Sequence, residues 1–148
     1  MAKEIRTEIT IQATPEKVWN ILTDFNAYPD WNPFITSITG RAEKGSALTV
    51  KIKPTDGKAM TFKPTVLTAA KNRELSWLGK LLFKGLFDGE HKFELIDHGN
   101  GTLTFVQSEK FKGIFVGMFN PEKTKSGFNE MNRKLKTLAE ENHKKAVI

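Results

Sequence analysis

Three polar side chains capable of acid–base chemistry or hydrogen bonding fall on strand faces that are otherwise apolar. His91 alternates with Phe93 and Leu95, so these residues share one face of a predicted strand. Gln107 and Glu109 share a face with apolar neighbours on a second predicted strand: Leu103, Phe105 and Phe111. A histidine beside a carboxylate on an apolar wall suits a general base with its orienting carboxylate, or an anchor for a ligand's polar head.

The link between the two strands decides whether these polar residues meet. Both apolar sets share one face only if the hairpin loop has an odd number of residues. The loop 99–101 has three, and Gly101 can adopt a positive φ. The register predicted in this way sets three pairs opposite one another: Leu95–Phe105, Phe93–Gln107 and His91–Glu109. A slip of two residues would instead set His91 opposite Gln107.

The predicted His91–Glu109 pair leaves three interpretations open. It handles protons in a reaction, it contacts a bound ligand, or it is a buried pair that satisfies itself or faces water at a cavity mouth. A measurement of His91 titration with and without ligand separates a functional role from a purely structural one.

The remaining residue types argue against several kinds of site. The chain has no cysteine, which excludes disulfides and thiolate chemistry. His98 lies beside the hairpin turn and His143 near the chain end, so the three histidines do not converge on a metal, and we expect no metal site and no cofactor. There is no glycine-rich phosphate loop or nucleophile elbow. The tryptophans have mostly aliphatic neighbours and are expected in the core or a cavity wall: Trp19, Trp31 and Trp77.

The charge pattern indicates a soluble protein without a nucleic-acid partner. The net charge is +6, and half of it comes from residue 121 onward, where seven Lys and Arg are interleaved with four Asp and Glu. Such interleaving is typical of a solvated helix face rather than of a groove that follows phosphates. No apolar run approaches a membrane span and the first residues do not resemble a secretory signal, so we expect no stable membrane insertion and a cytoplasmic location.

The elements that must position the polar residues are a run of strands between helices. Residues 4–12 alternate as a half-buried strand, and Thr14 and Pro15 then mark a helix start. Residues 25–34 are aromatic and broken by two prolines, which favours a short second helix or a tight turn. Six further strands with short links predict an antiparallel meander: 34–41, 47–53, 60–70, 75–82, 87–97 and 102–111.

The chain ends in a long amphipathic helix predicted over residues 120–143. Its apolar residues recur at helical spacing: Phe128, Met131, Leu135, Leu138 and Ala139. This stripe must pack against the sheet, and a sheet that curves around the helix can enclose a cavity. We expect the 128–135 face to form one cavity wall, with Gly127 tolerated because a side chain there would intrude on that space.

Three ordered signatures make the whole chain resemble the START-like SRPBCC superfamily, in its polyketide cyclase/dehydrase-like branch. They are I.A.P.KVW..L.D...YP.WNPF over residues 11–34, G.H.FEL....NGT.....SE.F.G over 89–113, and GF..MN..LK..AE over 127–140. The resemblance implies one α+β helix-grip domain over residues 1–148, in which a seven-stranded curved antiparallel sheet wraps the last helix and two short helices follow the first strand. It also implies a cavity for an apolar or amphipathic molecule.

These patterns predict that the protein binds a small hydrophobic or amphipathic ligand, lipid- or polyketide-like. The expected lining is apolar with three polar anchors: Trp31, Phe62, Trp77, Phe93, Phe105, Phe128 and Met131, with His91, Gln107 and Glu109. An alternative is a polyketide cyclase or dehydratase in which His91 and Glu109 handle protons. A second alternative is a protein-interaction module similar to the chaperone cofactors of the superfamily, which would need a filled core and an apolar surface patch.

The apolar segment 113–119 has two interpretations. It is an early turn of the last helix packed on the sheet edge, or a flap over the cavity mouth with hinges at Gly113 and Gly117. Together with Tyr28, Trp31 and Phe34 it would also suit a dimer patch. We therefore expect a monomer or a weak homodimer.

Overall fold

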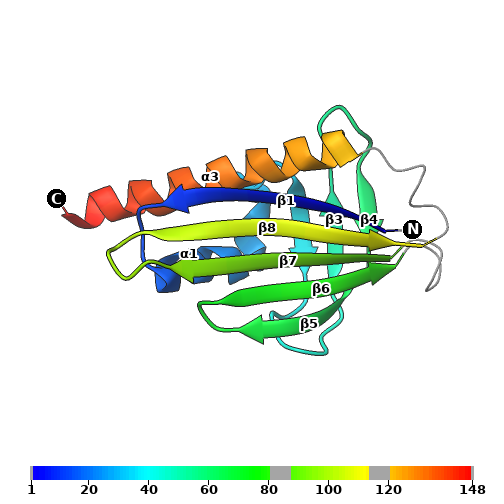
Figure 1. Ribbon diagram of the computed structural model, residues 1–148, viewed down its shortest axis with the longest axis horizontal. Coiled ribbons are helices and arrows are strands. Elements are labelled where there is room, and N and C mark those ends of the chain that lie inside the picture. The colour runs from blue at the N-terminus through cyan, green and yellow to red at the C-terminus, as the bar shows by residue number, and fades with distance from the viewer. Residues whose placement is uncertain (1, 81–87, 114–120, 148) are drawn as a thin grey trace.

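The computed structural model describes residues 2–80, 88–113 and 121–147 and shows a helix-grip architecture (Figure 1). Five antiparallel strands form the main sheet in the order β1-β8-β7-β6-β5. Their bounds are β1 Ala2–Ile11, β5 Thr65–Ala70, β6 Glu74–Lys80, β7 Asp88–Asp97 and β8 Leu103–Lys112. The long helix α3 (Pro121–Val147) crosses the inner face of this sheet, as expected for the helix-grip fold.

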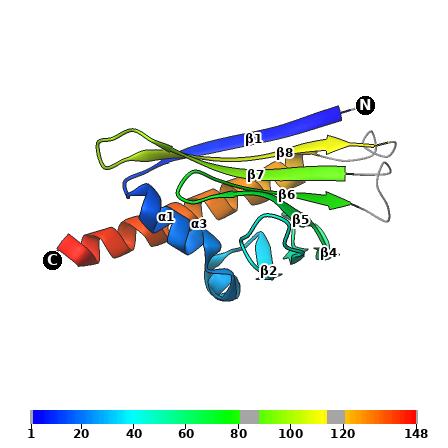
Figure 2. The same ribbon diagram turned by 90° about the horizontal axis from the view of Figure 1, so that it is seen from below.

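A second, three-stranded sheet was not anticipated. Strands β2 (Ile35–Thr39), β3 (Thr49–Ile52) and β4 (Met60–Phe62) pair in that order, and they lie on the same side of the main sheet as α3 (Figure 2). The prediction of a single strand over residues 60–70 was wrong, because β4 and β5 are separate. Pro64 stands between them, and a proline cannot donate a hydrogen bond to a sheet ladder. The described residues therefore hold eight strands instead of seven.

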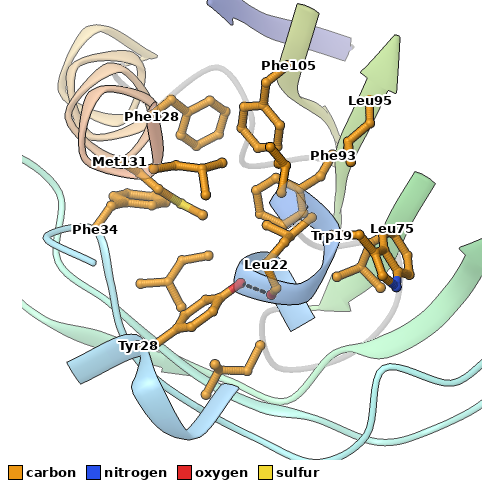
Figure 3. Packing of buried hydrophobic residues seen from close by; sticks show 14 of the residues in the cluster. Trp19, Leu22, Tyr28, Phe34, Leu75, Phe93, Leu95, Phe105, Phe128 and Met131 are labelled. Atoms are coloured by element: carbon orange, nitrogen blue, oxygen red, sulfur yellow. Dashed lines mark hydrogen bonds between the residues drawn. The ribbon is translucent and has the colours of Figure 1, made fainter. Parts of the chain in front are cut away.

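The segment between β1 and β2 contains three short helices. Helix α1 (Pro15–Thr23) begins as predicted: the Thr14 side chain accepts a hydrogen bond from the Lys17 amide at 3.2 Å, and Pro15 is the first helical residue. A 3₁₀ turn (Phe25–Ala27) and α2 (Tyr28–Trp31) follow it. The Tyr28 hydroxyl donates to the Leu22 carbonyl, which joins this aromatic segment to α1 (Figure 3).

Helix α3 is fixed at two points along its length. Near its beginning, the Thr55 hydroxyl from the β3–β4 loop lies within hydrogen-bond distance of Ser126 and Glu130. Farther along, Lys136 Nζ donates to the Thr10 carbonyl at 2.7 Å, and Glu140 accepts from the Gln12 amide at 2.8 Å. The helix is therefore held against the small sheet at one end and against β1 at the other.

The core lies between α3, α1 and the inner face of the main sheet (Figure 3). Phe128, Met131, Leu135 and Ala139 of α3 are fully buried, and the remaining stripe residue Leu138 is partly buried. Tyr28 and Phe34 are also buried, at 0% and 1% exposure. The expected dimer patch on these two residues is therefore wrong, because their side chains pack inside the chain. The predicted flap lies mostly outside the described residues.

Candidate functional site

The β7–β8 hairpin has the register that the loop parity predicted. Asp97 pairs with Leu103, and the His98 amide donates to the Thr102 carbonyl, which leaves the three-residue loop 99–101 with Gly101 at φ +86°. The three predicted pairs are confirmed: Leu95–Phe105, Phe93–Gln107 and His91–Glu109. The register shifted by two residues does not occur.

A cavity of about 180 Å³ lies between the two sheets. The small sheet and its flanks provide one wall: Phe34, Ile35, Val50, Ile52, Met60, Phe62 and Pro64. The main sheet provides the other: Trp77, Gly79, Gly89, His91, Glu109 and Phe111. Among the described side chains of helix α3, Thr124 lines the cavity. The described lining residues are apolar except for His91, Glu109 and Thr124.

The space exists because two glycines adjoin on the inner face of the main sheet. Gly79 on β6 pairs with Gly89 on β7, and the neighbouring row on this face carries Trp77, His91 and Glu109. Two adjacent positions without side chains, beside a row of large ones, leave unfilled volume. Gly89 has a second role, because a Cβ atom there would collide with the Glu109 carboxylate. The glycine therefore admits this carboxylate beside His91.

The His91 imidazole is buried and both of its ring nitrogens have partners. Nδ1 lies 3.0 Å from Glu109 Oε1, and Nε2 lies 2.9 Å from Gln107 Oε1. The ring stacks on Trp77 with centroids 5.2 Å apart, and the Phe128 ring lies 5.0 Å away. With both nitrogens engaged, His91 has no free atom for a ligand and acts through Glu109.

Glu109 is the carboxyl group that a molecule in the cavity would meet. Its side chain retains 17% exposure, compared with 5% for His91. Its Oε1 faces His91, whereas Oε2 has no hydrogen-bond partner among the residues that the structure describes. A carboxyl oxygen in this position can accept a hydrogen bond from a ligand, or donate one when protonated.

A chain of buried hydrogen bonds continues from His91 to β1 and α3. Gln107 Nε2 donates to Asn132 Oδ1 at 2.8 Å and lies 3.4 Å from the Phe128 carbonyl. Asn132 Nδ2 donates to Thr7 Oγ1 at 2.8 Å, and the Thr7 hydroxyl donates to the Gln107 carbonyl at 3.0 Å. The polar side chains of this buried chain, Gln107, Asn132 and Thr7, therefore have mutual partners.

Thr7 and Asn132 were missed as members of this network. The sequence contains a pattern that could have identified them. Thr7 is a polar residue among the inward-facing isoleucines of β1, and Asn132 lies four residues after Phe128 on the buried face of α3. An asparagine on such a face needs a polar partner. Its partner only becomes evident when α3 is placed across β1 and β8.

The structure places the predicted lining residues in two groups. Phe62, Trp77, His91 and Glu109 line the cavity. The others belong to the packed interior or its margin: Phe93, Phe105, Gln107, Phe128, Met131 and Trp31. The expected cavity wall on α3 is therefore core. Gly127 adjoins the Phe34 ring, with which a Cβ atom would collide, so the space that this glycine leaves is filled.

The other histidines lie apart from this site. His98 Nε2 is 2.7 Å from Thr104 Oγ1 at the exposed end of the hairpin, and position 143 lies near the end of α3. Among the side chains that the structure describes, in residues 3–79, 88–113 and 121–141, no three His, Asp or Glu gather as metal ligands would. None of the described helices is long and apolar enough to cross a bilayer.

Comparisons with solved structures show the same fold over nearly the whole chain. A START superfamily protein from Mycobacterium smegmatis aligns with a TM-score of 0.72 and 19% identity, over 93% of this chain and 97% of that chain. The major latex-like protein 151 of Panax ginseng aligns with a TM-score of 0.77 and 11% identity, over 94% and 98%. A point mutant of norcoclaurine synthase from Thalictrum flavum, in complex with a transition-state analogue, aligns with a TM-score of 0.74 and 14% identity, over 97% of each chain.

Sequence comparison supplies the family. No curated protein sequence gives a match. Residues 2–140 match the family described as polyketide cyclase/dehydrase and lipid transport. A match over nearly the full length, together with the helix-grip architecture and the intersheet cavity, leads to one conclusion: the chain belongs to the polyketide cyclase/dehydrase and lipid transport family.

Proposed function

We propose that the protein binds a small, mostly apolar molecule in the cavity between its two sheets. The observation that carries this proposal is an apolar cavity whose described lining residues include one carboxyl group, that of Glu109. Ligand sites are typically concave and apolar, with a few placed polar groups that orient the ligand. Family membership supports the same function, since the family includes lipid transport proteins by its description.

The size of the cavity favours a compact ligand. Its volume of about 180 Å³ is below the roughly 300–1,000 Å³ of pockets for drug-sized ligands. A single ring system or a short chain fits such a space better than a lipid with two acyl chains. We expect one aromatic or alicyclic moiety to pack against Trp77 and Phe62.

An NMR titration with naphthalene tests this function. We expect saturable shifts of the Gly79 and Gly89 amide signals, because these backbones form part of the cavity wall. Gly79→Val should weaken binding by filling the space, whereas Leu78→Val, one residue away and on the opposite face of β6, should not. Unchanged glycine signals at saturating naphthalene would contradict the proposal.

The His91–Glu109 pair favours acid–base catalysis as a second candidate function. The pair is joined at 3.0 Å and both residues line the cavity, which is the arrangement that a polyketide cyclase or dehydratase would need. In this function Glu109 exchanges a proton with the substrate, and His91 holds the Glu109 carboxyl group in position. A test is proton abstraction from 5-nitrobenzisoxazole, a compact apolar probe of a carboxylate base. A rate unaffected by Glu109→Gln would count against catalysis.

The interaction-module alternative receives less support. It required a filled core and a contiguous apolar surface patch. The structure instead has a cavity, and among the described residues only Met60 and Ile96 are large hydrophobic side chains with high exposure. These two residues lie in different sheets, so they do not define a docking surface.

A further inference from the structure

The buried hydrogen-bond chain determines how many protons the His91–Glu109 pair holds. The chain is anchored by two backbone carbonyls, which can only accept hydrogen bonds. The Thr7 hydroxyl must donate to the Gln107 carbonyl, so its oxygen is an acceptor for Asn132 Nδ2. Asn132 Oδ1 then accepts from Gln107 Nε2, which also faces the Phe128 carbonyl. Reversing the side-chain amides of Gln107 and Asn132 would set Gln107 Oε1 against the Phe128 carbonyl oxygen. It would also leave the single Thr7 hydroxyl hydrogen between two acceptors, the Gln107 carbonyl and Asn132 Oδ1.

This directionality fixes the tautomer of His91. Since Gln107 presents its carbonyl oxygen to the imidazole, Nε2 must carry a proton to make the contact at 2.9 Å. The contact between Nδ1 and Glu109 Oε1, at 3.0 Å, then also requires one proton. Without that proton, a nitrogen lone pair would face a carboxylate oxygen in a buried site.

The pair is consequently neutral wherever that proton lies. An imidazolium beside a carboxylate has no net charge, and neither has a neutral imidazole beside a carboxylic acid. His91 and Glu109 are the two ionisable residues among the described residues that line the cavity. Lys3 pairs with Phe111 in the register of β1 and β8 but is not a lining residue. The described wall therefore offers no unbalanced charge to a ligand.

We propose, on the basis of the binding function proposed above, that the cavity selects uncharged ligands that present a hydroxyl group to Glu109 Oε2. No Lys or Arg stands among the described lining residues, so a ligand carboxylate would meet no balancing cation there, and a ligand ammonium would meet a carboxyl group whose charge His91 already balances. Burying an unpaired charge is far more costly than burying a hydrogen-bonded hydroxyl. A hydroxyl also suits both positions of the shared proton, because it can donate or accept.

Four probes with one ring system test this selection in the wild-type protein: naphthalene, 1-naphthol, 1-naphthoate and 1-naphthylmethylammonium. Their dissociation constants are measured by calorimetry at neutral pH, with NMR shifts at Gly79 and Gly89 to locate the binding. We expect 1-naphthol to bind at least about tenfold tighter than either ion, equivalent to about 1.4 kcal/mol. Naphthalene should bind more weakly than 1-naphthol because it makes no hydrogen bond.

The variant His91→Gln tests the origin of the selection. Glutamine can donate to Glu109 but cannot supply the balancing proton, so the cavity becomes anionic and the ratio of ammonium to naphthol affinity should rise about tenfold. His98→Gln makes the same change at the exposed end of the hairpin and should leave the ranking unaltered. Circular dichroism verifies that both variants fold. If His91→Gln does not fold, the ranking of the four probes by affinity for the wild-type protein decides the question.

The outcomes separate the selection from the binding function. If naphthalene and 1-naphthol both fail to bind, the proposed function and the selection fail together. If naphthalene binds but an ion binds as tightly as 1-naphthol, the function stands and the selection is overturned. Tight binding of 1-naphthoate would point to Lys3 as the recognition group. A folded His91→Gln protein with the wild-type ranking would also overturn the proposal.

Discussion

Gly79 on β6 lies directly opposite Gly89 on β7, and their missing side chains open the cavity between the two sheets. The two positions are not equivalent. A Cβ atom on Gly79 would lie 3.8 Å from Pro64 Cβ, an ordinary contact, whereas one on Gly89 would collide with the Glu109 carboxylate. One glycine therefore leaves space for a ligand, and the other leaves space for a functional group of the protein.

Substituting each glycine by alanine should separate these two roles. Gly89→Ala displaces the Glu109 carboxylate from His91 and should lower the free energy of unfolding by about 1–3 kcal/mol. Gly79→Ala should cause no such loss, because the added methyl group makes only ordinary van der Waals contacts. Urea denaturation monitored by tryptophan fluorescence gives both values. Equal losses in the two variants would show that Gly89 is not specifically required for Glu109.

The contact between α3 and the Phe34 ring predicts an unusual effect of Gly127→Ala. In a helix interior this change normally stabilises by about 1 kcal/mol. Here the Cβ atom would collide with the Phe34 ring, whose centroid lies 5.3 Å from that of Phe128. We expect a net loss of about 1–3 kcal/mol from overpacking.

Second-site substitution provides the control for Gly127→Ala. Phe34→Leu removes the part of the ring that the new methyl group would meet, so the double variant should lose less stability than the two single losses added together. Urea denaturation gives the free energy of unfolding of each single variant and of the double variant. If Gly127→Ala alone stabilises the protein, Phe34 adapts to the methyl group and the close packing at this position is not restrictive.

Local patterns were sufficient to predict the elements closest to the site. The parity of the loop 99–101 determined which residues of β7 and β8 lie opposite one another, and this alone brought His91 to Glu109. Thr14 marked the start of α1 because a capping side chain acts within one helical turn. Both features depend on residues close in sequence or on one short connection.

Features that depend on distant packing were not predictable in the same way. The alternation of residues 60–70 continues through Pro64, so the division into β4 and β5 was hidden by the pattern. The Phe34 ring fills the space beside Gly127 because the residue before β2 is brought against α3, which no local pattern specifies. One cavity wall was consequently assigned to α3, whereas the small sheet and its flanks form that wall.

The buried polar network should show strong energetic coupling between Thr7 and Asn132. Thr7→Val removes the donor to the Gln107 carbonyl, and Asn132→Leu removes the acceptor of Gln107 Nε2. Each single variant leaves buried groups without partners and should cost about 1–3 kcal/mol. The double variant should cost less than the sum, because the first substitution has already broken the chain. Additive losses in a denaturation cycle would show that the two residues act independently.

Tyr28 predicts how stability changes in alkaline solution. Burial, assisted by the nearby Asp24 carboxylate, raises the pKa of the Tyr28 hydroxyl far above its ordinary value. The unfolded chain releases this proton near pH 10, whereas the folded chain retains it. Stability from this group is therefore complete below about pH 10 and declines as the pH rises further, since the unfolded state then binds fewer protons.

Tyr28 is the only tyrosine of the chain, so ultraviolet absorbance reports its ionisation directly. We expect the tyrosinate signal to appear together with unfolding measured by circular dichroism, instead of near pH 10 in the folded protein. Tyr28→Phe should remove this contribution to the alkaline loss of stability. At neutral pH the variant should cost about 1–3 kcal/mol, because the buried Leu22 carbonyl loses its side-chain donor. A tyrosinate signal near pH 10 with native circular dichroism would mean that the hydroxyl is accessible to solvent and that its bond to Leu22 does not hold the aromatic segment against α1.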